Sequence, residues 1–170
     1  DETEKIIKEL QKEYDFISYY KNNPNLGHDK NVLETLSAPS TEYVWLLGDS
    51  QAINPDELPY ILEILNKRKY DIISVNALER NLSHDSGPYN DPDEVFLKFC
   101  WHMTLTGATI YSKKSISSTI PFIIKYSKKA KYFFCLILTL QWGHFKSPFL
   151  ICFSSSSLEQ FGHMRPSKAI

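Results

Sequence analysis

The chain has 170 residues, of which 42% are hydrophobic, and this is enough for one domain with its own core. Nineteen Lys and Arg residues nearly balance 20 Asp and Glu residues, and the resulting formal charge of -1 excludes a general basic field, so we expect no nucleic-acid partner. The three cysteines are far apart and lack metal-ligand spacing, which favours reduced thiols over a disulfide framework or a zinc site. The charged first residues are not typical of a signal peptide, and no apolar run reaches the ~20 residues that span a bilayer.

Hydrophobic spacing predicts an alternation of helices and strands through the first half of the chain. Apolar residues recur every three or four positions in the helical segments, whereas the strand segments are short and rich in aromatic or β-branched residues. The expected helices cover residues 3–14, 29–36 and a segment that begins at Pro55, and the expected strands cover residues 15–22, 43–47 and 70–77. The third helix should turn one apolar face inward, formed by Leu58, Ile61, Leu62 and Leu65.

This alternation is typical of a single α/β domain, with a mostly parallel, mixed sheet and helices on both faces. Residues 79–95 are polar and rich in turn formers, so we expect a long loop there. From Phe96 onward the pattern predicts a helix, then a strand around residues 106–109, and then a basic and aromatic helical region that extends to Trp142.

A small polar cluster, Gly48-Asp49-Ser50-Gln51, follows the strand that begins at Tyr43. Ligands of open α/β sheets bind beyond the carboxyl ends of the strands, so we expect this cluster to face a ligand. Asp49 is the only carboxylate of the cluster. The alternative for Asp49 is an ordinary capping role in the turn that follows.

The order of these motifs resembles the family 2 glycosyltransferases, nucleotide-sugar enzymes of the A-type, Rossmann-like fold. DETEKIIKELQKEY resembles the helix that follows the family's first Asp/Gly/Ser-rich turn, and NNPNLG resembles its N-x-G loop. HDKNVLETLSAPSTEYVWLLGDSQAINPDEL resembles the segment into and past its metal motif. YVWLLGD is most similar to enzymes that add sugars to bacterial surface polysaccharides. The resemblance covers residues 1–78 well and returns at LTGATIYSKK, the acceptor-side strand.

The resemblance implies a nucleotide-sugar-binding part over residues 1–78 and an acceptor-side part over residues 79–170. It implies donor contacts from Asn25, Gly27, Lys30, Asn31, Gly48, Asp49, Ser50 and Gln51, and acceptor-side contacts from Trp101, His102, Thr106 and Gly107. Lys30 stands where the family often has Arg, at the opening of a helix whose amino end also attracts phosphate. A solvated helix start is the alternative for Lys30, and core packing is the alternative for Trp101 and His102.

Two departures from the family pattern affect the metal motif and the donor pocket. Positions 48–51 align with the usual carboxylates, but Ser and Gln oxygens are weaker ligands for a hard cation. Mn²⁺ or Mg²⁺ would therefore bind at Asp49 weakly, or together with the phosphates of the substrate. The family's first strand, first helix and second strand have no counterpart, so the resemblance predicts weak or absent turnover for these 170 residues alone.

The resemblance leaves the catalytic base unassigned. The family usually has an acidic base late in the domain, but Glu159 is the only carboxylate in residues 110–170. More distant candidates are Asp85, Asp91, Asp93, Glu94 and His102. The basic residues within 125–131, beside the aromatic segment 132–142, fit peripheral association with an anionic membrane, where the family's lipid-linked acceptors lie; a solvated helix is the alternative.

The sequence therefore predicts a glycosyltransferase that moves a sugar from a nucleotide-diphosphate sugar to a saccharide or lipid-linked acceptor in bacterial polysaccharide biosynthesis. We expect it in the cytoplasm, including the inner face of the membrane. A non-catalytic relative that serves as a binding or scaffold protein is the alternative, since lost carboxylates suit such a protein. A nucleotidyltransferase is disfavoured because the chain contains no Gly-rich, basic loop near its start.

Overall fold

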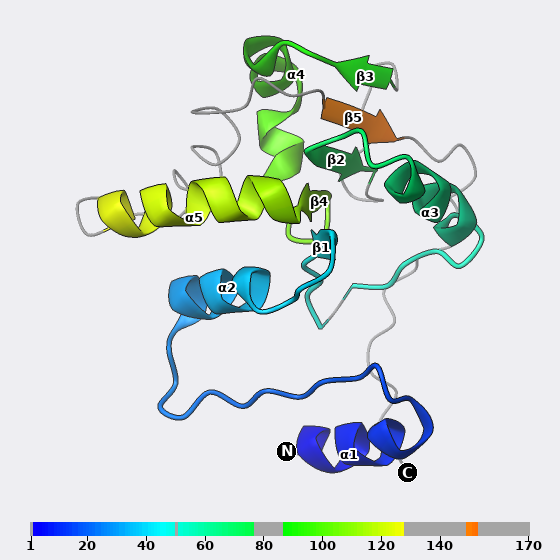
Figure 1. Ribbon diagram of the computed structural model, residues 1–170, viewed down its shortest axis with the longest axis vertical. Coiled ribbons are helices and arrows are strands. Elements are labelled where there is room, and N and C mark those ends of the chain that lie inside the picture. The colour runs from blue at the N-terminus through cyan, green and yellow to red at the C-terminus, as the bar shows by residue number, and fades with distance from the viewer. Residues whose placement is uncertain (1, 50, 77–86, 128–148, 153–170) are drawn as a thin grey trace. The chain divides into compact units, whose positions relative to one another are not determined.

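The computed structural model describes residues 2–49, 51–76, 87–127 and 149–152 (Figure 1). The chain divides into two compact units, Asp1–Glu34 and Thr35–Ile170, which we describe separately. The helices are α1 (Thr3–Glu13), α2 (His28–Ser37), α3 (Leu58–Asn66), α4 (Pro92–Met103) and α5 (Lys113–Ser127). The strands are β1 (Tyr43–Trp45), β2 (Ile72–Val75), β3 (Gly87–Tyr89), β4 (Thr109–Ser112) and β5 (Phe149–Cys152).

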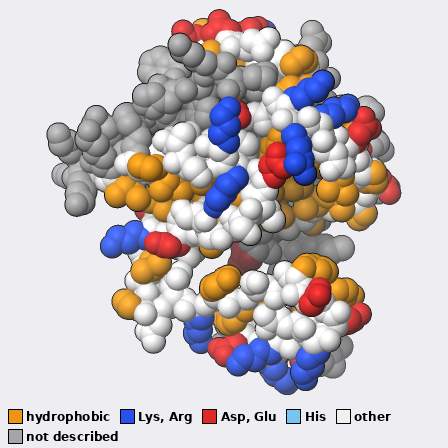
Figure 2. All heavy atoms as spheres, in the orientation of Figure 1, with side chains coloured by type: hydrophobic (Ala, Val, Ile, Leu, Met, Phe, Trp, Pro, Cys, Tyr) orange, Lys and Arg blue, Asp and Glu red, His pale blue; other side chains and the backbone are white. Residues whose placement is uncertain are grey.

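The first unit contains α1 and the loop that leads into α2, and both helices confirm the prediction. Figure 2 shows Lys and acidic side chains interspersed over α1, where Glu4 forms ion pairs with Lys8 at 2.7 Å and with Lys21 at 3.3 Å. The predicted strand over residues 15–22 is wrong, because that segment is irregular and Phe16 and Tyr20 are each 79% exposed. Alternating aromatic residues do not make a strand unless a neighbouring strand accepts and donates its backbone hydrogen bonds.

The described strands form a five-stranded sheet in the second unit, in the order β1-β4-β2-β5-β3 (Figure 1). β4 pairs antiparallel with both β1 and β2, β5 pairs parallel with β2, and β3 pairs antiparallel with β5. β1, β2 and β5 therefore point the same way, yet three of these four pairings are antiparallel. The expectation of a mostly parallel sheet is not confirmed, because β4 inserts between β1 and β2 and pairs antiparallel with both, and β3 pairs antiparallel with β5.

Helices cover both faces of this sheet. On one face, the core is formed by Ile61 and Ile64 of α3 with Ile73, Val75 and Ile110 of the strands. On the other face, it is formed by Val95, Phe99 and Met103 of α4 with Ile72. Consecutive strand residues point to opposite faces, so β2 contributes to both cores and is the central buried strand.

The inward face of α3 differs from the prediction. Ile61 and Ile64 are buried and Leu65 packs against them, whereas Leu58 is 37% and Leu62 is 48% exposed. The helix carries apolar residues around most of its circumference, so their spacing alone does not fix which face turns inward.

The long loop expected over residues 79–95 is wrong at its end, where β3 and the first turn of α4 form. Residues 77–86 lie outside the described part of the chain. The start of α4 has a local cause: the Asp91 carboxylate accepts a hydrogen bond from the Asp93 amide at 3.0 Å, and Pro92 occupies the first turn. The helix expected from Phe96 onward is confirmed by α4. The strand expected around residues 106–109 forms as β4 but begins only at Thr109, after a turn at residues 106–107.

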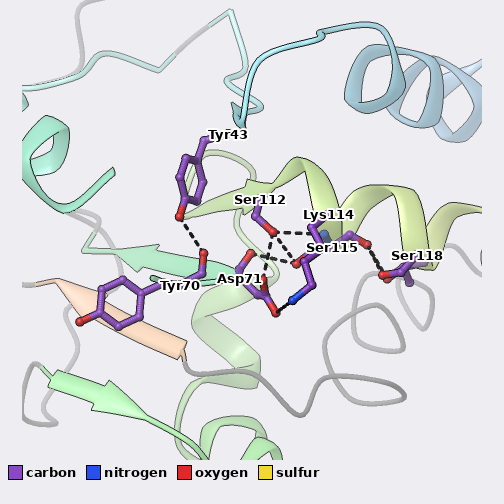
Figure 3. A network of polar contacts seen from close by, with 8 residues as sticks. Tyr43, Tyr70, Asp71, Ser112, Lys114, Ser115 and Ser118 are labelled. Carbon is purple, nitrogen blue, oxygen red and sulfur yellow. Dashed lines mark hydrogen bonds and ion pairs between the residues drawn. The ribbon is translucent and has the colours of Figure 1, made fainter. Parts of the chain in front are cut away.

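A polar network joins the start of β2 to the end of β4 and the start of α5 (Figure 3). Ser112 caps α5, because its Oγ accepts from the Ser115 amide at 3.1 Å and donates to Asp71 Oδ1 at 3.3 Å. The Asp71 carbonyl accepts from the Ser112 amide at 2.8 Å and from Ser115 Oγ at 3.1 Å. Beside it, the Tyr43 hydroxyl donates to the Tyr70 carbonyl at 2.9 Å, and burial raises the pKa of Tyr43. These groups bond to one another, so this end of the sheet serves the fold.

Candidate functional site

The opposite end of the sheet brings the carboxyl end of β1 beside the amino end of β4. Trp45 and Ile110 are register partners, so the residues after Trp45 lie next to those before Ile110. The Trp45 indole Nε1 donates to the Gly107 carbonyl at 2.8 Å. We call the group formed here by Gly48, Asp49, Gln51, Thr106 and Gly107 the strand-end site. It combines residues that the sequence assigned to the donor side with residues that it assigned to the acceptor side.

Gln51 makes the connection between the two halves of the strand-end site. Its Oε1 accepts a hydrogen bond from the Gly48 amide at 2.7 Å, and its Nε2 donates to the Thr106 carbonyl. The Gln51 backbone amide also donates to the Gly48 carbonyl at 3.1 Å, so two hydrogen bonds join residues 48 and 51. Both ends of the carboxamide are therefore engaged by backbone groups of the protein.

The backbone and its surroundings favour glycine at position 107. Gly107 has φ +86°, in the left-handed region that side chains rarely adopt, and a Cβ there would lie 2.5 Å from Gln51 Oε1. At Gly48 the nearest approach of such a Cβ would be 3.4 Å, to the same oxygen. The bare backbone at position 107 is what lets the Gln51 amide reach the Thr106 carbonyl.

Asp49 is exposed, and its carboxylate has no hydrogen-bond or ion-pair partner among the described residues. Ser50, the other polar residue of the turn, lies outside the described part of the chain. Groups of three or more His, Cys, Asp or Glu side chains that would hold a metal ion are absent from the described residues. Among the described residues of the strand-end site, only Asp49 offers a charged oxygen, which fits a cation that takes its other ligands from bound phosphates.

The two aromatic residues predicted on the acceptor side lie on different sides of α4. Trp101 is 71% exposed, whereas His102 is 2% exposed and its Nε2 lies 2.7 Å from the Val75 carbonyl, the last residue of β2. A carbonyl accepts only, so Nε2 carries the proton in this contact. This favours the core-packing alternative for His102.

The remaining residues that were predicted on the donor side lie in the first unit. The Asn25 side chain accepts from the Gly27 amide at 2.8 Å, Gly27 has φ +74°, and the Gly27 carbonyl accepts from the Asn31 amide at 3.1 Å. The Asn31 side chain accepts from Asn22 at 2.7 Å, and Lys30 is exposed on the first turn of α2. These contacts build a loop that closes the amino end of α2.

Trp45 is the residue of this region that the sequence analysis did not single out. A Trp at the end of a half-buried strand needs an acceptor for its indole N–H. This requirement alone could have indicated a contact made by Trp45. The acceptor is supplied from 62 positions away, so nothing near Trp45 in the sequence identifies it.

The cysteines, the basic segment and the membrane-span prediction can be compared with the structure only over the described residues. Cys100 is a free, half-buried thiol, as expected. Most of the basic segment 125–131 and all of residues 132–142 fall outside the described part of the chain. Within the described ranges, the helices are too short or too polar to cross a bilayer.

Comparison with known proteins assigns the chain to a family. Abequosyltransferase RfbV of Salmonella typhimurium is 33% identical over 69 residues, which are 40% of this chain and 21% of that protein, so the chain spans about a fifth of this relative's length. No solved structure matches the chain significantly. The model of glycosyl transferase family 2 matches residues 1–130, which contain the whole strand-end site, and the chain therefore belongs to this family, whose A-type fold was expected from the sequence.

Proposed function

We propose that the chain is part of a glycosyltransferase that moves a sugar from a nucleotide-diphosphate sugar to a saccharide or lipid-linked acceptor in bacterial polysaccharide biosynthesis. Family membership and the likeness to an abequosyltransferase support sugar transfer in such a pathway. The observation that carries the assignment to a particular site is the exposed Asp49 carboxylate at the end of β1, beside the Thr106–Gly107 turn.

The chemistry of the strand-end site suits the leaving group of this reaction. Loss of the sugar leaves negative charge on the departing diphosphate, and a divalent cation bound there would neutralise it as it develops. Asp49 would hold this cation by one carboxylate oxygen, and the donor phosphates would complete the coordination, as is common for Mg²⁺. The Gln51 carboxamide already bonds to the Gly48 amide and the Thr106 carbonyl, so the proposal assigns the cation to Asp49.

The residues of the first unit are proposed as a second set of donor contacts. The Asn25–Gly27 turn leads into the amino end of α2, where backbone N–H groups and the Lys30 ammonium favour an anion. Trp101 is proposed as the acceptor-side aromatic residue, because its exposed ring can stack on a sugar.

Calorimetric titration with UDP and UDP-sugars, with and without Mn²⁺, tests the proposal. The expected result is Mn²⁺-dependent binding that is lost in Asp49→Asn and retained in Asp56→Asn, which changes another exposed acidic residue in the turn before α3. Binding that is unaffected by Asp49→Asn would overturn the assignment of the site. Metal-independent binding without sugar transfer would favour the non-catalytic binding protein.

Membrane association and a location at the inner face of the membrane are part of the proposal for the whole protein. Co-sedimentation of the chain with vesicles that contain anionic lipid, compared with neutral vesicles, tests the first. Equal binding to both kinds of vesicle, or binding to neither, would remove the electrostatic argument from residues 125–131.

A further inference from the structure

We infer that Gln51 is a positioning residue that holds the donor-side turn against the acceptor-side turn and is not itself a ligand of metal or phosphate. The role of Gln51 at the donor site rests on the proposed function, but the hydrogen bonds that Gln51 makes do not depend on that function. It assigns Gln51 a task other than the one its place in the metal motif implies.

The hydrogen-bond pattern fixes which end of the amide faces which partner. The Gly48 N–H only donates and the Thr106 C=O only accepts, so only one orientation of the carboxamide satisfies both groups. No carboxylate can do the same, because an ionised carboxylate has no hydrogen to offer Thr106. A glutamine is therefore chemically distinct at this position from the acidic residues that bind metals.

The surroundings of Gln51 are built around the same contact. Gly107 lacks the Cβ that would collide with the amide, and the Trp45 indole holds the Gly107 carbonyl from the β1 side. Two hydrogen bonds thus cross from the β1 end to the 106–107 turn, one from Trp45 and one from Gln51. The Gln51 side chain also accepts from the amide of Gly48, the residue before Asp49, so a change of this side chain should move the Asp49 carboxylate.

Gln51→Glu separates the two roles because they predict opposite signs. If Gln51 were a ligand, a carboxylate would add a harder oxygen and tighten Mn²⁺ binding in the presence of UDP. If Gln51 is a positioning residue, the substitution places an anion opposite the Thr106 carbonyl in place of a donor. Binding should then weaken about tenfold, the size expected from losing one hydrogen bond. Gln11→Glu is the matched control, since Gln11 Nε2 also donates to a backbone carbonyl, that of Ile17 at 3.0 Å in the first unit.

The indole N–H resonance of Trp45, assigned with Trp45→Phe, reports the contact without any ligand. We expect it to shift in Gln51→Glu and in Gln51→Ala but to stay in place in Gln11→Glu. Tighter Mn²⁺ binding in Gln51→Glu, or an unmoved Trp45 resonance in both Gln51 variants, would overturn the inference.

The two measurements also separate this inference from the proposed function. If the chain binds neither Mn²⁺ nor UDP, or if Asp49→Asn changes nothing, the proposed site fails. The Trp45 resonance then still decides whether Gln51 joins the two turns.

Discussion

The indole nitrogen of Trp45 donates to the carbonyl oxygen of Gly107 at 2.8 Å, across 62 positions of sequence. This contact lies where β1 and β4 run antiparallel, next to the hydrogen bond between Gln51 and Thr106. The two hydrogen bonds join the segment that carries Asp49 to the turn that precedes β4. The geometry of the strand-end site therefore depends on backbone groups as much as on the one carboxylate that the sequence made conspicuous.

Trp45→Phe should lower the free energy of unfolding by about 1–2 kcal/mol, because the Gly107 carbonyl loses its donor and part of the packing around β1 is lost. Urea denaturation measures the change. Trp101→Phe is the control, and a change of no more than about 0.5 kcal/mol is expected because Trp101 is 71% exposed. Equal effects of the two substitutions would contradict the role given to Trp45.

Gly107→Ala should destabilise the chain more than Gly27→Ala, although both glycines have positive φ. Each substitution adds strain of about 1–2 kcal/mol from the left-handed backbone. Only at position 107 does the new Cβ also displace the Gln51 amide, since nothing lies within 4 Å of a Cβ at Gly27.

A double variant checks the cause of this difference. The double variant Gly107→Ala/Gln51→Ala should lose less unfolding free energy than the sum of the losses in the two single variants. Once Gln51→Ala has removed the amide, the Cβ added at position 107 no longer collides with it. Strict additivity in urea denaturation would show that the Gln51 amide is not what makes Gly107 necessary.

Ser112→Ala should lower the free energy of unfolding by about 1 kcal/mol or more, since it removes the cap of α5. Ser118→Ala, on the same helix, is the control and should be nearly neutral because that hydroxyl only donates back to the Ser115 carbonyl at 2.9 Å. Mn²⁺ and UDP binding should survive Ser112→Ala, because Ser112 lies at the other end of the sheet. Loss of binding in this folded variant would contradict that separation.

Ionisation of Tyr43 should lower the free energy of unfolding at high pH. Burial raises the pKa of its hydroxyl in the folded state, so the folded chain keeps this proton at pH values where the unfolded chain has lost it. The contribution of Tyr43 is thus fully present below the unfolded pKa of about 10 and is lost as pH rises through the raised folded pKa. Urea midpoints of the wild type should converge with those of Tyr43→Phe above pH ~10, and a constant difference would contradict the shift.

Local patterns in the sequence were enough to predict most helices. The periodicity of residues 3–14 and 29–36 gave α1 and α2 to within a few residues, because helical hydrogen bonds are made inside the segment itself. The Asp-Pro pair at 91–92 is a typical helix start and was a signal for α4. It was not used, because the polar, turn-rich residues around it favoured a loop.

Contacts between distant segments were not predictable from the sequence. Residues 15–22 have the alternation of a strand but no partner strand, and β4 enters the sheet between β1 and β2 although it follows both. The same limit applies to the site. Gln51 was predicted to contact the donor because of its place in the motif, whereas its partner Thr106 lies 55 positions away in the sequence. Without knowledge of such partners, a side-chain amide is easily interpreted as a contact to metal or phosphate.

The donor site at the end of β1 is tested most directly by locating bound Mn²⁺ through the paramagnetic broadening of amide resonances in the presence of UDP. If Asp49 holds the cation, the signals of Gly48 and Gly107 broaden at the lowest Mn²⁺ concentrations, and Asp49→Asn abolishes this effect. Early broadening around the carboxylates of α1, with Gly48 and Gly107 unaffected, would contradict a donor site at this end of the sheet.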